Sequence, residues 1–545
     1  MKHRVAAVFL TVCLLLSLLA VPAAAAGRYS DVPEGDWAAE VIEKATEYGL
    51  IQGKGDGTFG YGEYMNRASF VTVLCRMFGW EMVSPEKPSF SDCPPGEWYY
   101  SAVETALANG AIDSGLYFRP DDDISRQDMA VMLVRALGYE NLALTQASAE
   151  LPFADVTENR GYLALAYEFG VINGVAQADG SLLFLPGHSS TRQEAAAMLV
   201  RVYEKYHADI EFLHGFYAMS SYGQIDMAGE MDAVSLGWAR MSLDESGTPY
   251  VNQSASGGNE WAVPQGAELA TDALEEAGVD CNLSVYAAGS DLTAILSAGN
   301  RQTAVEQLVR AAGEYAGLTI DFEGLGASLR TPFTQFMTAL RAELPEEKAL
   351  WVCVQPDEWY GGYDYRALGE ICGKVILMAH DYQDTNLPQG WVGTSQTRNA
   401  PAPINKVYEA LRAITDPDTG VADTGKIALA VSISSVGLRV DENGLLASTD
   451  IYTPAPDTLA ARMEQSDAVR TWDAAAATPY LTYSADGEHY KVWYEDAQSI
   501  MAKVNLAHMF GVDGLSIWRL GIIPDYAGAQ NYDVWSAVQT QRAGE

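Results

Sequence analysis

The chain has 545 residues, of which 48% are apolar, so it is long enough for several folded domains and too apolar to be mainly disordered. Its 72 acidic residues outnumber its 34 lysines and arginines, which gives a formal net charge of −38 at pH 7. Polyanions are repelled by such a chain, and no run of basic residues interrupts it. The composition therefore argues against nucleic-acid binding.

The N-terminus has the three parts of a secretory signal peptide. Lys2 and Arg4 provide the basic start, an apolar stretch covers 5–20, and a run of small residues ends at Ala26. The apolar stretch is short for a membrane span, and no later segment resembles one. We therefore expect residues 1–26 to be removed and the protein to be secreted.

Five cysteines follow this segment, an odd number without the spacing of metal ligands. A chain of this length does not need disulfides to hold its fold. We expect these residues to be buried, free thiols that pack as small apolar side chains. They are Cys75, Cys93, Cys281, Cys353 and Cys372.

One sequence unit occurs three times in the first two hundred residues. Each copy opens with an aromatic residue and an aspartate, continues into an amphipathic helix with a glycine stop, has an aromatic turn, and closes with a polar N-cap before a second helix. The aspartates are Asp31, Asp92 and Asp155, the turn aromatics are Phe59, Phe118 and Phe184, and the arginines that open the second helices are Arg67, Arg126 and Arg192.

The segment from about Tyr29 to Tyr206 resembles three S-layer homology repeats, which we place at 27–86, 87–147 and 148–207. The resemblance implies one α-rich, pseudo-threefold unit that binds a secondary polysaccharide of the bacterial cell wall, often a polymer with pyruvyl carboxylates. By this resemblance Arg67, Arg126 and Arg192 would bind the polymer, with Trp37 and Trp98 beside them. The alternative is that each arginine only ties a loop to a helix end. The first repeat has Ser69 where the family usually has an acid.

After Tyr206 short apolar runs alternate with helical stretches, a pattern typical of β-α units around a parallel sheet. Eight such runs predict a TIM (β/α)8 barrel over 208–545, with a small strand-rich insertion at 441–490. The predicted strands are Leu213–Ala218, Ala233–Ala239, Asn282–Tyr286, Gly317–Phe322, Ala349–Val354, Lys374–Met378, Lys426–Ile433 and Gly514–Trp518.

The fourth run continues into two acids, Asp321 and Glu323, which are two residues apart. Side chains alternate along a strand, so both acids and Thr319 should point to the same face. Two carboxyl groups in one pocket cannot both ionise freely, and one should keep its proton near neutral pH. Such a proton donor suits glycosidic bond cleavage, although a lone D-x-E is more often a solvated strand end.

Two other strand ends also carry polar or aromatic groups. The sixth ends at Met378 and is followed by His380, Asp381 and Tyr382, and the eighth ends at Trp518. Because the carboxyl ends of barrel strands meet at one rim, we expect these groups to share a carbohydrate pocket with Asp321 and Glu323. Trp518 would offer a flat apolar surface to a sugar ring.

The region from about Phe212 to Val538 resembles glycoside hydrolase family 18, within the branch of spore-cortex and peptidoglycan N-acetylglucosaminidases. The resemblance implies that the N-acetyl oxygen of the substrate attacks the anomeric carbon. By this resemblance Glu323 would be the general acid and base, and Asp321 would orient the acetamido group. Trp518 and Met378 would line the subsite, and Asp381 with His380 or Tyr382 would hold the acetamido oxygen. No metal or cofactor is expected.

Thr319 and His380 depart from the family pattern, which has an acid and a tyrosine at these positions. The sequence therefore leaves two main hypotheses. The first is a hydrolase of glycans that contain N-acetylglucosamine, most plausibly peptidoglycan, attached to the wall by the repeats. The second is a glycan-binding barrel with little or no turnover. An inert barrel in a structural S-layer protein is a third and weaker reading.

Overall fold

The computed structural model describes residues 28–218, 221–356 and 360–543, so the predicted signal peptide lies outside the described residues. The chain divides into two compact units between Glu204 and Lys205. Within the described ranges, no helix combines the length and the apolar character needed to cross a bilayer. All five described cysteines are free, four of them buried and Cys281 half-buried, which confirms the prediction against a disulfide framework.

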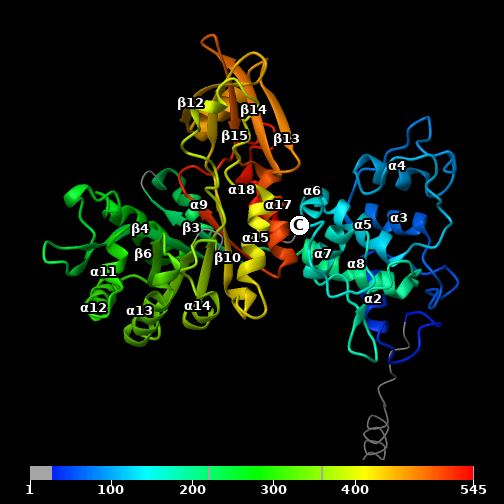
Figure 1. The fold of residues 1–545 in the computed structure, drawn as a ribbon, viewed down its shortest axis with the longest axis horizontal. Helices are drawn as coiled ribbons and strands as arrows, with labels where there is room; N and C mark the ends of the chain where they lie inside the picture. The colour runs from blue at the N-terminus through cyan, green and yellow to red at the C-terminus, as the bar shows by residue number, and fades with distance from the viewer. Residues whose placement is uncertain (1–27, 219–220, 357–359, 544–545) are drawn as a thin grey trace, which may run out of the picture. The chain divides into compact units, whose positions relative to one another are not determined.

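The first unit is built mainly from helices (Figure 1). Polar residues begin the second helix of the first two repeats as predicted, because the side chains of Asn66 and Ser125 accept hydrogen bonds from the third backbone N–H of each helix. Two short strands, β1 and β2, pair to form a small sheet. The elements are α2 (Ala39–Glu47), α3 (Arg67–Met77), α4 (Tyr100–Ala108), α5 (Arg126–Ala136), α6 (Glu140–Thr145), α7 (Arg160–Glu168), β1 (Val175–Ala176), β2 (Leu182–Leu183) and α8 (Arg192–Tyr206).

The aspartate at the start of each repeat fixes the aromatic turn of the same repeat. Asp31 accepts hydrogen bonds from the backbone N–H groups of Phe59, Gly60 and Tyr61 at 2.7, 2.7 and 2.8 Å. Asp92 and Asp155 bind the equivalent turns at Phe118 and Phe184 through two N–H groups each. Burial would raise the pKa of Asp31, but these N–H donors hold it below its usual value. The repeated aspartate is thus a turn anchor.

The arginine of each repeat reaches the aromatic turn of the next one. Nε of Arg67, Arg126 and Arg192 donates at 2.9 Å to the carbonyl of Phe118, Phe184 and Phe59, respectively. Each guanidinium also lies 5.0–5.1 Å from the ring centroid of the same phenylalanine. Since Arg192 returns to the first repeat, the three contacts form a closed cycle.

Replacing Asp31 by Asn should loosen the first turn, because an amide oxygen accepts the three N–H groups less strongly and its NH2 group opposes one of them. We expect a loss of about 2 kcal/mol in local stability. Exchange of the 59–61 amides, followed by mass spectrometry, should then be about 30-fold faster. Because the folded pKa is lowered, the native contribution should also fade as pH falls below about 4. The exposed Glu43→Gln is the control, and equal exchange in both variants would contradict the anchor role.

The second unit contains the predicted (β/α)8 barrel (Figure 1). Its eight parallel strands pair in the order β3-β16-β10-β9-β8-β7-β6-β4, and β4 pairs with β3 to close the ring. Three predicted strands match the structure residue for residue, and the others differ by a few residues at their ends. The strands are β3 (Phe212–Tyr217), β4 (Ala233–Leu243), β6 (Asp280–Ala288), β7 (Gly317–Glu323), β8 (Ala349–Val354), β9 (Lys374–Met378), β10 (Ile427–Ser432) and β16 (Gly514–Trp518).

Helices follow most barrel strands, in keeping with the predicted alternation of apolar runs and helical stretches. They are α9 (Ile225–Gly229), α10 (Ala267–Ala277), α11 (Asp291–Ile295), α12 (Arg301–Ala312), α13 (Arg330–Glu343), α14 (Tyr365–Ile371), α15 (Ile404–Ile414), α17 (Ala497–Met509) and α18 (Val534–Ala543). A short strand, β5 (Pro249–Asn252), pairs antiparallel with the end of β4. It lies beside residues 240–243, the last four residues of β4.

An antiparallel five-stranded sheet interrupts the barrel between β10 and α17, drawn in yellow and orange in Figure 1. It begins before and ends after the predicted range 441–490, because its first and last strands continue directly from barrel segments. Its elements are β11 (Val436–Val440), β12 (Leu446–Tyr452), α16 (Pro456–Met463), β13 (Val469–Asp473), β14 (Thr478–Ala485) and β15 (Glu488–Trp493).

Candidate active site

Asp321 and Glu323 lie at the carboxyl end of β7, the rim at which a TIM barrel carries its chemistry. Asp321 is 4% exposed, and its side chain hydrogen-bonds to Cys353 on the neighbouring strand β8. Glu323 is half-buried. Both carboxylates raise the pKa of Tyr286, which lies next to them on β6. The two acids therefore face the same space, as their spacing in the sequence predicted.

The surroundings of Asp321 favour its protonated form. Burial and the charge of Glu323 raise the pKa of Asp321 well above the usual value, although the hydrogen bond to Cys353 lowers it in part. Its Oδ1 atom is buried without a hydrogen-bond partner among the described residues. A buried polar atom without a partner is costly, so this oxygen is suited to a ligand group that donates a hydrogen bond.

Glu323 is also easier to protonate than a free glutamate. Burial raises its pKa, the nearby His380 lowers it, and Asp381 raises it. A carboxyl group that keeps its proton toward neutral pH can serve as a general acid. Two acids with unequal surroundings are the arrangement that acid–base chemistry on a sugar requires.

Below the pair, the barrel interior contains a chain of polar contacts. The buried imidazole of His214 contacts the hydroxyls of Ser516 and Ser235 at 2.8 Å each, and Ser235 contacts Thr319 at 2.7 Å. Asn282 donates to Thr319 at 3.4 Å. Burial lowers the pKa of His214 to about 3, so the ring is neutral. Thr319, which stands where the family has an acid, is thus a hydrogen-bonded part of this network.

A tyrosine and a glutamine that the sequence did not single out hold the end of β7. The Tyr363 hydroxyl donates to the carbonyl of Phe322 at 2.8 Å, and Gln355 Oε1 accepts from the backbone N–H of Gly324 at 2.7 Å. Both contacts flank Glu323 in the chain. They fix the backbone from which the acid projects, and no local sequence signal marks them.

The segment after β9 brings His380 and Asp381 to the same rim. His380 is 7% exposed, and its Nδ1 lies 3.0 Å from the Asp381 carboxylate. Burial would raise the pKa of Asp381, but contacts with His380, Gln383 and Ser432 hold it below its usual value. The Tyr382 hydroxyl donates to the Lys406 carbonyl on α15 at 3.4 Å. His380, rather than this phenol, is therefore coupled electrostatically to Glu323.

Aromatic rings form a continuous wall beside the acids. Trp518, at the end of β16, lies 5.4 Å from Phe216 and 6.1 Å from Trp261, measured between ring centroids. Trp261 stacks on Tyr286 at 4.9 Å. Met378 packs with Trp518 against the apolar residues of the barrel interior. Trp518 and Met378 were predicted, whereas Trp261 lies in a loop whose position only the folded chain defines.

The predicted polymer-binding residues of the first unit differ in exposure. Trp37 and Trp98 are 59% and 61% exposed, although tryptophan is usually mostly buried. Besides the contacts to phenylalanine, Arg67 pairs with Asp128 at 2.6 Å, while Arg126 and Arg192 donate to the carbonyls of Asn173 and Gln52. The acid of the second repeat thus serves the arginine of the first. The arginines do tie loops to helix ends, which was the alternative reading.

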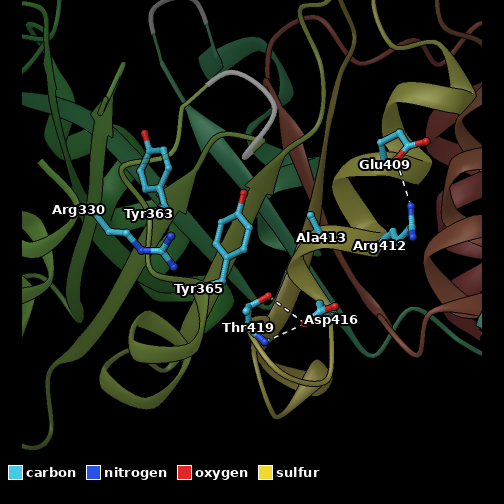
Figure 2. Close-up of a pocket in the computed structure, with 8 residues that line it drawn as sticks. All are labelled: Arg330, Tyr363, Tyr365, Glu409, Arg412, Ala413, Asp416 and Thr419. Atoms are coloured by element: carbon cyan, nitrogen blue, oxygen red, sulfur yellow. Dashed lines mark hydrogen bonds and ion pairs between the residues drawn. The ribbon is translucent and has the colours of Figure 1, made fainter. Parts of the chain in front are cut away.

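A separate pocket opens elsewhere on the barrel surface, and Figure 2 shows the side chains around it. Its lining includes neither Asp321 nor Glu323. Tyr363 connects the two places, because it lines this pocket while its hydroxyl supports β7. The lining residues are Arg330, Tyr363, Tyr365, Glu409, Arg412, Ala413, Asp416 and Thr419.

Residues 286–522 match the sequence profile of glycosyl hydrolases family 18, and this range includes both acids, His380, Asp381 and Trp518. The barrel carries a family 18 domain. Residues 28–71 and 89–130 match the S-layer homology domain, so the first unit carries that domain as well. The recognition of both families from the sequence is confirmed. The third repeat, at 148–207, stays a prediction that its equivalent aspartate, phenylalanine and arginine contacts support.

Curated relatives share parts of the chain. An amylopullulanase of Thermoanaerobacterium thermosulfurigenes is 30% identical over 186 residues, which cover 32% of this chain and 10% of that protein. A cortical fragment-lytic enzyme of Bacillus subtilis (strain 168) is 26% identical over 219 residues, which cover 38% of this chain and 47% of that enzyme. The chain thus spans less than half the length of either relative.

Among solved structures, the C-terminal domain of a putative chitinase from Desulfitobacterium hafniense DCB-2 has a similar fold. The match covers 62% of this chain and 99% of that domain. The sequence identity is 19% and the TM-score is 0.49.

Proposed function

We propose that this protein is a glycoside hydrolase that cleaves glycans containing N-acetylglucosamine, with retention of configuration and with assistance from the substrate. The observation that carries the proposal is the placement of Asp321 and Glu323 on one face at the end of β7, both with a raised pKa. The family 18 domain around them supports the same assignment.

In this proposal Glu323 protonates the leaving oxygen and then, as a carboxylate, activates the incoming water. Asp321 orients the acetamido group of the bound sugar, whose oxygen attacks the anomeric carbon, and stabilises the positive charge that develops on that group. The unpartnered Oδ1 of Asp321 is available for the acetamido N–H. Trp518 and Met378 would support the sugar ring, and His380 with Asp381 would hold the acetamido oxygen. No metal or cofactor is part of this scheme.

We place the substrate in the bacterial cell wall. The S-layer homology domains and the basic start of the chain support a secreted protein that is attached to a wall polysaccharide. Arg67, Arg126 and Arg192 would meet carboxylates of that polymer with the guanidinium edges that their backbone contacts leave open, and Trp37 and Trp98 would pack against its sugars. Peptidoglycan is then the nearest glycan with N-acetylglucosamine.

The mass of the soluble products tests this assignment. Purified protein should release fragments with reducing N-acetylglucosamine ends from peptidoglycan or spore cortex. Fragments with muramic acid at the reducing end would instead show that the other glycosidic bond of the glycan is cut. Absence of soluble fragments from any wall preparation would overturn the hydrolase.

A glycan-binding barrel with little turnover is the alternative. The contact between the Tyr382 hydroxyl and α15 favours it, because it engages the phenol that was expected to replace the family's tyrosine. Tight binding of wall fragments by the native protein, without cleavage, would be the decisive result for this reading.

The pH dependence of the rate should report on His380. His380 lowers the pKa of Glu323, so His380→Gln should raise it, and removal of the imidazole also leaves more of the Asp381 charge uncompensated. Glu323 must be protonated to act as the acid, so the alkaline limb of kcat/KM should move to higher pH. Rates on a soluble chromogenic N-acetylglucosamine oligomer would measure this shift. A limb that stays in place or moves to lower pH would show that Glu323 does not set it.

A further inference from the structure

Arg240 lies in the same row of the barrel as the acid pair. It is in register with Tyr286 on β6, and Tyr286 is in register with Asp321 on β7. The pairing of β4 with β6 shifts between Leu236 and Ala239, a bulge that changes the direction of the following side chains. Beyond it, β5 pairs with β4 and supports the backbone of Arg240.

The guanidinium of Arg240 lies 5.7 Å from the centroid of the Tyr286 ring. Among the described residues it has no hydrogen bond and no ion pair, unlike Arg470 and Arg341, whose guanidinium groups donate to protein acceptors. Arg240 is half-buried, and no acid among the described residues forms an ion pair with it. Its five N–H donors are held on a flat aromatic support and lack an acceptor.

The charge of Arg240 acts on the tyrosine beside the acid pair. Burial, Glu323 and Cys353 determine the pKa of Asp321, while burial, His380 and Asp381 determine that of Glu323. Arg240 acts on Tyr286, whose pKa burial and the two acids raise and Arg240 partly lowers. The cation is therefore close to the site.

We propose that Arg240 binds a carboxylate on the substrate glycan and so selects an anionic, muramic-acid-type chain over a neutral N-acetylglucosamine polymer. This inference rests on the proposed function and narrows its substrate. In this arrangement the Trp261 and Tyr286 rings support the sugar rings that lie between the acid pair and Arg240. A planar guanidinium fork is well matched to a carboxylate, and a neutral polymer offers no such partner.

Two carboxylates could occupy this position. One is the lactyl group of a muramic acid that has lost its peptide, and the other belongs to the short peptide that this group otherwise carries. Three substrates separate the cases: neutral N-acetylglucosamine oligomers, glycan strands stripped of peptides by an amidase, and fragments that retain their peptides.

The test compares Arg240→Gln with the native protein on all three substrates. We expect kcat/KM to fall about 30-fold on a carboxylate-bearing glycan. On the neutral oligomers it should fall by about threefold or less. Selective loss on stripped strands assigns the lactyl group, and selective loss on peptide-bearing fragments assigns the peptide. Equal losses on all three substrates would overturn the proposal. Arg310→Gln, an exposed arginine on α12, controls for the change in net charge.

A binding measurement separates this proposal from the hydrolase assignment. In a Glu323→Gln background, calorimetric titration with the same fragments requires no turnover. Addition of Arg240→Gln should weaken binding of a carboxylate-bearing fragment about 30-fold, and Arg240→Lys, which keeps the charge but loses the fork, should weaken it less. Unchanged dissociation constants would overturn the role of Arg240, even if the native protein proved inactive.

Discussion

Glu323→Gln should lower kcat on peptidoglycan by about three orders of magnitude, because the amide cannot protonate the leaving sugar oxygen and cannot activate water afterwards. The loss should fall on kcat rather than KM, since Gln keeps the size of the side chain and most of its contacts.

Stability should change in the opposite direction. The folded pKa of Glu323 is raised, so above the ordinary pKa of a glutamate its ionisation costs the fold stability, and the neutral Gln carries no such cost. The variant should therefore melt at the same temperature as the native protein or slightly higher. Glu276→Gln, an exposed residue of α10, is the matched control. If Glu323→Gln released products at the native rate, Glu323 would not be the general acid.

Asp321→Asn should be the second most damaging change, with a loss in kcat of about two orders of magnitude. Asn retains an oxygen for the acetamido N–H, but it cannot ionise to the carboxylate that would stabilise the positively charged intermediate. Since Asp321 is buried and its protonated form is favoured, the neutral Asn should be tolerated by the fold.

Steady-state rates on soluble oligomers, with Asp272→Asn on α10 as an exposed control, would measure this effect. A variant with native kcat and native KM would mean that the substrate does not rely on this side chain. A variant with native kcat but a raised KM would limit Asp321 to binding.

The sequence predicted the barrel well because its strands are short apolar runs with clear limits. β8, β9 and β16 coincide with their predicted runs. Period-two alternation also placed Asp321 and Glu323 on one face before any contact was known. These features depend on local patterns, which a single sequence contains.

The missing parts depend on contacts between distant segments. Trp261 and Tyr363 reach the site from loops, and Arg240 reaches it after a bulge that no residue type announces. The insertion was placed too narrowly because β11 continues a barrel segment without a turn signal. The contacts of the repeat arginines with the next repeat could not be predicted either, because they involve residues more than 50 positions away.

The closed cycle of arginine and phenylalanine contacts has a consequence for partial versions of the first unit. Three links join three repeats, so deletion of any one repeat severs two of them and leaves a single link. The unit should accept new termini between repeats, because such a permutation preserves every link. It should not accept shortening, and a natural chain that lost one copy would need a second molecule to complete the ring.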